Sequence, residues 1–481
     1  MDQYRNYIDG AWASSHASTR NINPSNTDDV IGLFASGTSD DAASAIAAAR
    51  AALPAWARSS IQQRHDILRK AADEILARRE ELGRALSREE GKTLPEGVAE
   101  ATRAGQIFAF FAAECLRTDG ELLSSVRSGI SVEITHEPIG PIAIITPWNF
   151  PIAIPAWKIA PALAYGNTVV FKPAELVSHS AWLLVDILNR AGLPNGVLNL
   201  VMGKGSVVGQ AMLESPAIAG VSFTGSTATG RRLAMTAVGA SPMKKLQLEM
   251  GGKNPLVVLD DADLETALNC AINGAYFSTG QRCTASSRLI VTEGIHKRFV
   301  DGLTPRLAAL TVGDALKDGV QIGPVVDAAQ LEQDERYIAI GRAEGARLHW
   351  GGDRLTRDTP GFFLQPALFT DVDPAMRIAR EEIFGPVAVV IPAKNYDHAL
   401  ALANDTEFGL TAGICTTSLK TAAHFKRNAE AGMVMVNLPT AGVDYHVPFG
   451  GRKSSSYGPR EQGRHAREFY TTTKTAYVDP S

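Results

Sequence analysis

Hydrophobic and polar positions along the chain follow two periods, one typical of strands and one of helices. Short runs rich in β-branched residues and bounded by glycine or proline predict strands at 141–147, 167–173, 196–201 and 220–225. Apolar residues at helical spacing predict helices at 39–53, 61–86, 180–192 and 206–215, of which the first begins at a Ser-Asp-Asp cap and the second ends near Gly91. The alternation of strand and helix favours a mostly parallel sheet with helices on both faces.

A second set of strand-like runs follows at 255–259, 287–293, 385–393, 412–417 and 432–437. Because 481 residues are too many for one core, we expect two α/β domains in series with a boundary near 245–255. The segments 129–140 and 467–479 alternate between apolar and polar residues in the manner of exposed strands. Such segments fit strand pairing between subunits or an ordinary surface hairpin about equally well.

Composition narrows the class of protein. The chain is 45% hydrophobic and 20% charged with a net charge of −4, so a nucleic-acid partner is not expected. The first residues lack the pattern of a signal peptide, and no run of 18 apolar residues suggests a membrane partner. The four cysteines are scattered singly, which predicts reduced thiols in the cytoplasm, with neither a disulfide framework nor a metal site.

Two glycine-rich loops follow predicted strands and suggest a nucleotide site. In 199–210 the third glycine comes one residue late for a dinucleotide fingerprint, and 222–234 lacks the lysine of a nucleoside-triphosphate loop. Gly225 and Ser226 would nevertheless place backbone N–H groups at a helix start, an arrangement that suits a pyrophosphate. The other interpretation is a tight turn that requires glycine. Lys172 and Glu175 follow another strand, where a carboxylate could bind ribose hydroxyls and repel a 2′-phosphate.

Six motifs occur in order along the chain: TPWNFP (146–151), FKPAE (171–175), LEMGGKNP (248–255), GQRC (280–283), EEIFGPV (381–387) and PFGGRK (448–453). Together they resemble the NAD(P)-dependent aldehyde dehydrogenase superfamily over essentially the whole length. The resemblance implies an aldehyde dehydrogenase-like α/β fold with a Rossmann-type coenzyme domain (1–117 and 139–249) and an α/β catalytic domain (250–447). It also implies a small β oligomerisation arm (118–138 and 466–481) and assembly as a homodimer or homotetramer.

The resemblance also implies roles for individual residues. Cys283 is expected to be the nucleophile, Glu249 the general base and Asn149 the oxyanion donor, with Lys158 as a support close to them. A glutamate at position 249 favours a carboxylic acid product over transfer of the acyl group to coenzyme A. The residues expected to bind the coenzyme, which is NAD with NADP as an alternative, are Thr146, Pro147, Trp148, Lys172, Glu175, Gly225, Ser226, Gly251, Glu382 and Phe384.

The substrate is expected to be a small aldehyde. The segments GQRCTASSRLIV and PFGGRKSSSYGPREQG look most like the branch that oxidises α-ketoglutaric semialdehyde (2,5-dioxopentanoate). Succinic semialdehyde and aromatic aldehydes are alternatives, although Ala285 stands where succinic semialdehyde dehydrogenases usually carry a second cysteine. Phe150 and Trp157 are candidates for an apolar substrate pocket, with core packing as the other interpretation.

Two further positions leave questions for the structure. Arg282 precedes the nucleophile, where its charge could lower the thiol pKa, pair with an anionic substrate or form a structural ion pair. Ser456 stands where the family usually has glycine, and we expect it to change the local turn and the neighbouring substrate loop without affecting catalysis.

Two functions of other classes remain open on the sequence alone. A cysteine esterase or hydrolase could use the same thiol without a coenzyme, although no histidine is placed as its partner. A catalytically silent binding protein on this scaffold would not need to retain Cys283, Glu249 and Asn149 together.

Overall fold

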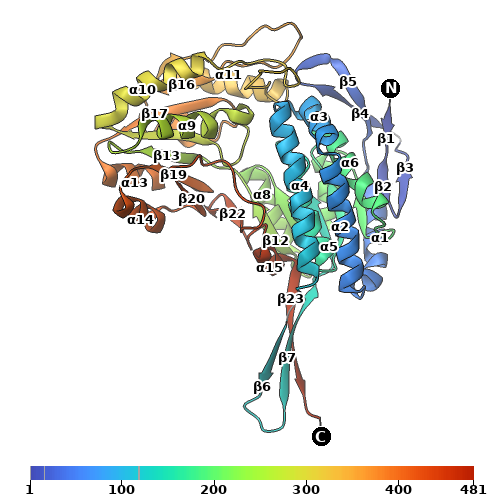
Figure 1. The fold of residues 1–481 in the computed structure, drawn as a ribbon. Coiled ribbons are helices and arrows are strands. Elements are labelled where there is room, and N and C mark those ends of the chain that lie inside the picture. Colours follow the sequence, from blue (N-terminus) through green and yellow to red (C-terminus); the bar gives the residue numbers. More distant parts are fainter. Residues whose placement is uncertain (1, 16, 118–119, 481) are drawn as a thin grey trace.

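The computed structural model describes residues 2–15, 17–117 and 120–480, and these residues form two α/β regions and a projecting arm (Figure 1). The first region contains a sheet in the order β22-β12-β11-β8-β9-β10-β2-β3. Its strands are β2 (Asn6–Ile8), β3 (Ala11–Ala13), β8 (Pro141–Ile145), β9 (Thr168–Lys172), β10 (Leu198–Leu200), β11 (Gly220–Thr224), β12 (Lys245–Glu249) and β22 (Ser456–Tyr457).

The middle of this sheet is parallel, from β12 through β11, β8 and β9 to β10. The chain runs outward from β8 to β10 and then returns to the other side of β8 with β11 and β12. The strand order therefore reverses between β8 and β11. Ligands of such sheets bind beyond the carboxyl ends of the strands at this reversal, which here means after Ile145 and Thr224.

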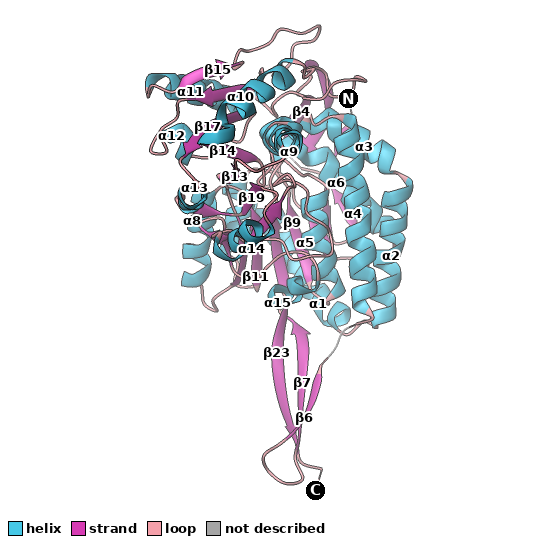
Figure 2. Cartoon of the chain, turned by 60° about the vertical axis from the view of Figure 1, so that its left-hand side comes forward, coloured by secondary structure: helices cyan, strands magenta, loops and turns pink. Residues whose placement is uncertain are grey.

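Helices pack on this first sheet and beside it (Figure 2). They are α1 (Ser39–Ala57), α2 (Ile61–Ala77), α3 (Arg79–Glu90), α4 (Leu94–Cys115), α5 (Ala153–Ala164), α6 (Ser178–Arg190), α7 (Gln210–Glu214) and α8 (Thr227–Gly239). A smaller sheet at the N-terminal end contains β1 (Gln3–Tyr4), β4 (Ser18–Asn23) and β5 (Asn26–Ala35). The strands predicted at 141–147, 167–173, 196–201 and 220–225 are confirmed.

The helix predictions need three corrections. The expected continuous helix over 61–86 breaks at Arg78, whose guanidinium pairs with carboxylates on both sides of the break. Thr38, one residue before the expected cap, is the N-cap of α1 and forms a capping box with Asp41. The segment expected to be helical at 206–215 begins as one π-helical turn (Gly205–Gly209) before α7.

The second α/β region contains a sheet in the order β15-β16-β17-β14-β13-β19-β20, parallel except for β15. Its strands are β13 (Asn254–Val258), β14 (Ser286–Thr292), β15 (Arg347–Trp350), β16 (Ala367–Thr370), β17 (Val387–Ala393), β19 (Thr411–Cys415) and β20 (Met433–Val436). Its helices are α9 (Leu264–Ala275), α10 (Glu293–Ala308), α11 (Ala328–Ala343), α12 (Arg377–Arg380), α13 (Tyr396–Asn404) and α14 (Leu419–Asn428). The five predicted strands of this region are confirmed, and β15 and β16 are additional.

The arm extends away from both regions in Figures 1 and 2. It is an antiparallel sheet of β6 (Glu121–Ser124), β7 (Ser131–Pro138) and β23 (Thr471–Val478), with α15 (Arg467–Tyr470) at the base of β23. The strand predicted at 129–140 is confirmed, and that predicted at 467–479 is confirmed from Thr471 onward, since Arg467–Tyr470 form a helix with Phe469 and Tyr470 buried. Pairing of these strands with another subunit stays a prediction. The exact domain boundaries also stay a prediction. In the part of the chain that the structure describes, no helix is long and apolar enough to span a membrane.

Candidate active site

Cys283, the cysteine of the GQRC motif, lines a cavity of about 330 Å³. Its lining includes Phe150 and Trp157, the two aromatic residues proposed from the sequence, together with Phe449. Arg282 and Cys283 lie in its wall, so the predicted nucleophile and all three predicted substrate residues share one cavity. No histidine is found among the described residues that line it.

Cys283 lies in the loop between the short 3₁₀ turn (Phe277–Gly280) and β14. Ser278 and Thr279 in that turn have positive φ angles of 52° and 57°, an uncommon conformation for residues with a side chain. Burial and, to a smaller extent, the charges of Glu249 and Glu382 raise the pKa of the Cys283 thiol to about 12. Hydrogen bonds from the backbone N–H groups of Thr284 and Cys283 act in the opposite direction.

The carboxylate of Glu249 is buried at the carboxyl end of β12. Burial raises its pKa well above the ordinary value, and the charge of Glu461 acts in the same direction. Ser456 lies opposite Glu249 in the antiparallel pairing of β12 with β22, and its hydroxyl donates a 2.5 Å hydrogen bond to Glu249 Oε2. The same Ser456 Oγ accepts a hydrogen bond of 2.6 Å from the backbone N–H of Gly451.

Ser456 was expected to change the local turn and the substrate loop without affecting catalysis; it contacts the predicted base as well, and its effect on catalysis stays a prediction. Its hydroxyl is bonded directly to the predicted base, and this hydrogen bond lowers the pKa of Glu249 against the effect of burial. Residue 456 itself has no positive φ, so a side chain is accommodated there without the backbone strain that glycine would relieve.

Asn149 and Lys158 are held by different partners. The Asn149 side-chain amide donates to the carbonyl of Gln281 at 2.9 Å, which ties it to the loop of Cys283. Lys158 is fully buried on α5, donates to Ser222 Oγ at 2.9 Å and forms an ion pair with Glu461. The positive charge of Lys158 also lowers the pKa of Glu249, the predicted base.

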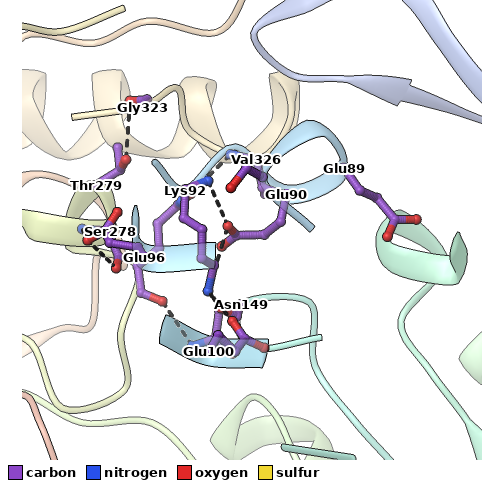
Figure 3. A network of polar contacts seen from close by, with 12 residues as sticks. Glu89, Glu90, Lys92, Glu96, Glu100, Asn149, Ser278, Thr279, Gly323 and Val326 are labelled. Atoms are coloured by element: carbon purple, nitrogen blue, oxygen red, sulfur yellow. Dashed lines mark hydrogen bonds and ion pairs between the residues drawn. The ribbon is translucent and has the colours of Figure 1, made fainter. Parts of the chain in front are cut away.

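A charged cluster on α4 and the segment before it was not predicted from the sequence (Figure 3). Buried Lys92 donates to Glu100 at 2.6 Å and to the carbonyl of Asn149 at 2.7 Å. Glu100 accepts hydrogen bonds from backbone N–H groups at the start of α5. Glu96, Glu100 and Arg103 lie along one face of α4. Charged residues at this helical spacing in an otherwise apolar helix are the sequence signal that could have predicted the cluster.

Arg282 forms the structural ion pair that was one of its three interpretations. Its guanidinium donates to Glu96 Oε1 at 2.9 Å and to Ser278 Oγ at 2.9 Å. Glu96 also accepts from the backbone N–H of Ser278, so this ion pair supports the turn before Cys283. The largest influences on the pKa of the Cys283 thiol are burial and the charges of Glu249 and Glu382, and an effect of Arg282 on this pKa stays a prediction.

Several predicted coenzyme residues lie at the carboxyl ends of the first sheet. Thr146 and Pro147 follow β8, and the Thr146 backbone N–H bonds the carbonyl of Lys172 at 3.2 Å. Burial lowers the pKa of Lys172 to about 8, while Glu175 beside it acts in the opposite direction. The Thr146 hydroxyl is buried and has no hydrogen-bond partner within the described residues, so it has a donor free for a ligand.

The turn after β11 lies on the other side of the strand reversal. Gly225 follows Thr224, and Ser226 is the N-cap of α8, with its hydroxyl exposed and accepting from the backbone N–H of Thr229. The Ser226 hydroxyl also donates to Thr229 Oγ1 at 3.0 Å, so the backbone N–H groups at the helix start are what make this turn a suitable anion site.

The remaining predicted coenzyme residues lie close to Cys283. Glu382 Oε1 accepts from the backbone N–H of Gly252 at 2.9 Å, and a side chain at Gly251 would collide with the Glu382 carboxylate. Burial raises the pKa of Glu382 to about 7. Phe384, which has a positive φ of 67°, packs edge-on against Trp148 at 5.4 Å between ring centroids. The charge of Glu382 also acts on the Cys283 thiol, so the two residues are close.

This arrangement suits covalent chemistry on a carbonyl compound. A thiol in an aromatic-walled cavity, an amide donor beside it and a buried carboxylate with a raised pKa are the groups that such chemistry requires. The groups at the sheet reversal remain the predicted site for the coenzyme.

Comparison with known proteins agrees with this geometry. Alpha-ketoglutaric semialdehyde dehydrogenase of Bacillus subtilis is 43% identical to the chain over 100% of its length and 99% of the relative. The 2,5-dioxopentanoate dehydrogenase of Saccharolobus solfataricus is 41% identical over 99% of both chains.

A solved structure with the same fold is betaine aldehyde dehydrogenase from Staphylococcus aureus in complex with NAD+. It superposes with a TM-score of 0.96 at 35% identity, covering 99% of this chain and 95% of the other. Residues 12–476 match the aldehyde dehydrogenase family. The chain belongs to the aldehyde dehydrogenase family.

Proposed function

We propose that the protein oxidises α-ketoglutaric semialdehyde to its carboxylic acid with NAD+ as the hydride acceptor. The reaction type is supported by three observations: Cys283 lines an aromatic-walled cavity, the Asn149 amide binds the carbonyl of Gln281 in the same loop, and the charge of Glu249 acts on the thiol. The substrate assignment is supported by full-length relatives at 41–43% identity that are named for this semialdehyde.

In the proposed reaction Cys283 provides the attacking atom. Its thiolate forms a carbon–sulfur bond with the aldehyde carbon, and the resulting oxyanion is stabilised by the Asn149 amide and the Cys283 backbone N–H. When bound, the nicotinamide coenzyme accepts the hydride that leaves this carbon. The thioester that remains on Cys283 is then attacked by water, whose proton passes to Glu249. The carbon–sulfur bond breaks, and the acid and the thiolate are released.

Glu249 has to be ionised to take that proton. Burial favours the protonated form of its carboxyl group, while Ser456 and Lys158 oppose this by lowering its pKa. We propose that both groups position Glu249 and tune its charge, and that Lys158 in addition balances the charge of Glu461.

For the coenzyme, the residues present fit NAD+. The unpartnered Thr146 hydroxyl and the Lys172–Glu175 pair suit the ribose of the adenosine half, with Pro147 and Trp148 beside them. Gly225 and Ser226 suit the pyrophosphate. Gly251, Glu382 and Phe384 suit the nicotinamide half of the coenzyme. Glu175 would repel the 2′-phosphate of NADP, so NAD+ is the expected choice.

The assignment is tested by initial rates with a panel of aldehydes and both coenzymes. We expect the highest kcat/KM with α-ketoglutaric semialdehyde and NAD+, ahead of succinic semialdehyde, betaine aldehyde and benzaldehyde. A higher kcat/KM for any of the last three would overturn the substrate assignment while leaving aldehyde oxidation intact. Ester hydrolysis at full rate without nucleotide, with no aldehyde oxidation, would favour the hydrolase alternative.

Replacing Ser456 with alanine is expected to shift the pH dependence of acid release. The variant loses the hydrogen bond that lowers the pKa of Glu249, so this pKa rises and the acidic limb of the kcat profile moves to higher pH. At pH 7 we expect kcat to fall by about tenfold, the effect of about one hydrogen bond to a charged group.

The matched control is Ser454→Ala, because Ser454 bonds Arg231 and not the base. In this control the acidic limb of the kcat profile should stay at the same pH as in the wild type. An unshifted limb in Ser456→Ala would show that Ser456 does not tune Glu249.

Assembly and location are proposed on separate grounds. The arm exposes Leu122, Leu123, Tyr477 and Val478, apolar side chains that one subunit does not cover, which supports a homodimer or homotetramer built through this arm. No disulfide joins cysteines in the part of the chain that the structure describes, which supports a location in the cytoplasm.

A further inference from the structure

Three cationic side chains line the cavity of Cys283, and two of them are neutralised by carboxylates. Lys92 pairs with Glu100 at 2.6 Å and Arg282 pairs with Glu96 at 2.9 Å. Arg103 has no carboxylate within ion-pair distance among the described residues. The cavity therefore has one uncompensated positive charge, and that charge belongs to Arg103.

The guanidinium of Arg103 is fixed in place although it lacks a counter-ion. Its Nη2 donates to the side-chain oxygen of Gln462 at 3.2 Å, and its Cζ lies 5.7 Å from the centroid of the Trp157 ring. Its Nε is buried and has no hydrogen-bond partner in the part of the chain that the structure describes. A buried donor without a partner is costly to maintain, and in a cavity wall it indicates a ligand that supplies the acceptor.

Arg103 and Cys283 are within electrostatic reach of each other. Burial lowers the pKa of Arg103, whereas Glu100, Cys283 and Asp444 act in the opposite direction. A guanidinium keeps its proton in proteins even when its pKa is lowered, so the charge is permanent. Glu100 is already bound to Lys92 and to two backbone N–H groups, and Asp444 is an exposed residue of the loop at the cavity mouth.

We propose that Arg103 binds the distal carboxylate of the substrate and selects aldehydes that carry an acidic group at the other end. This inference rests on the proposed function and adds the residue that determines its preference for an acidic aldehyde. A guanidinium offers paired N–H donors that match the two oxygens of a carboxylate, and the aromatic wall excludes the water that would weaken the pair. The same charge disfavours a quaternary ammonium substrate such as betaine aldehyde.

The test compares α-ketoglutaric semialdehyde with pentanal, which has the same five-carbon length but no carboxylate. In Arg103→Gln we expect kcat/KM for the semialdehyde to fall by about 100-fold or more, the usual effect of removing one partner of a buried charge pair. The kcat/KM for pentanal should change by less than about threefold. Arg103→Lys, which keeps the charge and loses the paired donors, should lie between the wild type and Arg103→Gln.

The control is Arg282→Gln, which removes the other arginine of the cavity wall but one whose charge is already paired. Because Arg282 supports the nucleophile loop, its loss should lower kcat/KM for both aldehydes by a similar factor. A selective loss in Arg282→Gln, or an equal loss for both aldehydes in Arg103→Gln, would overturn the proposal. A wild-type enzyme that oxidises pentanal but not the semialdehyde would instead overturn the proposed substrate.

A second measurement does not depend on the variant being active. The ligand 2-oxopentanoate has the distal α-keto acid of the substrate and a methyl group in place of the aldehyde, and 2-pentanone lacks the carboxylate. We expect 2-oxopentanoate to compete with pentanal in the wild type at least tenfold better than 2-pentanone does. Equal inhibition by the two ligands in the wild type would contradict an anionic subsite in this cavity.

Discussion

Replacing Cys283 with alanine is expected to lower aldehyde-dependent NAD+ reduction by about 10⁴-fold or more, because no other described cavity residue offers a thiol. The substitution removes the sulfur from a site whose other groups remain, so coenzyme binding and the melting temperature should stay close to the wild-type values. Initial rates with α-ketoglutaric semialdehyde and with pentanal measure the loss, and both substrates should be affected equally.

The matched control for this variant is Cys115→Ala. Cys115 is a buried cysteine at the end of α4, where it packs in the core of the first region. Its replacement should lower thermal stability and keep kcat within a few-fold of the wild type. Substantial oxidation by Cys283→Ala, or a comparable loss in Cys115→Ala, would place the nucleophile elsewhere.

Replacing Glu249 with glutamine is expected to separate the two halves of the reaction. Glutamine has nearly the same size but cannot accept the proton of water, so the thioester forms and is not hydrolysed. Rapid mixing at neutral pH should show a burst of about one NADH per active subunit, followed by turnover that is slower by about 10²–10⁴-fold.

A different carboxylate provides the contrast for the Glu249 variant. Glu382 is buried beside Cys283 as well, but it binds the backbone of Gly252 and is proposed to hold the coenzyme. Glu382→Gln should therefore slow the burst itself. A normal steady state in Glu249→Gln at neutral pH would exclude Glu249 as the base.

The parallel strands and the residues that follow them could be predicted from the sequence because each is a local pattern. The run at 167–173 contains β-branched residues between Gly166 and Pro173, and β9 is found at Thr168–Lys172. Likewise, Gly225 and Ser226 follow a strand and start a helix, as the spacing suggested. These features depend on neighbours within about ten residues.

The contacts that tune the site could not be predicted because they join distant segments. Ser456 is 207 residues from Glu249 and meets it through the pairing of β22 with β12. Arg282 is 186 residues from Glu96, which the motif around Cys283 does not reveal. The break of the helix at Arg78 likewise has no glycine or proline to mark it. For Ser456 and Arg282 a tertiary contact decides what the local pattern leaves open, whereas the partners of Arg78 at the helix break, Glu74 and Glu81, are its neighbours in sequence.

The central claim, that the reaction passes through an acyl group on Cys283, is tested most directly by mass spectrometry of the Glu249→Gln variant. The variant is mixed with NAD+ and α-ketoglutaric semialdehyde, quenched in acid after the NADH burst and digested. The account predicts that the peptide containing Cys283 gains the mass of the acyl group, while the peptides of Cys115, Cys270 and Cys415 remain unchanged. A burst of NADH without this adduct, or with the adduct on another cysteine, would contradict it.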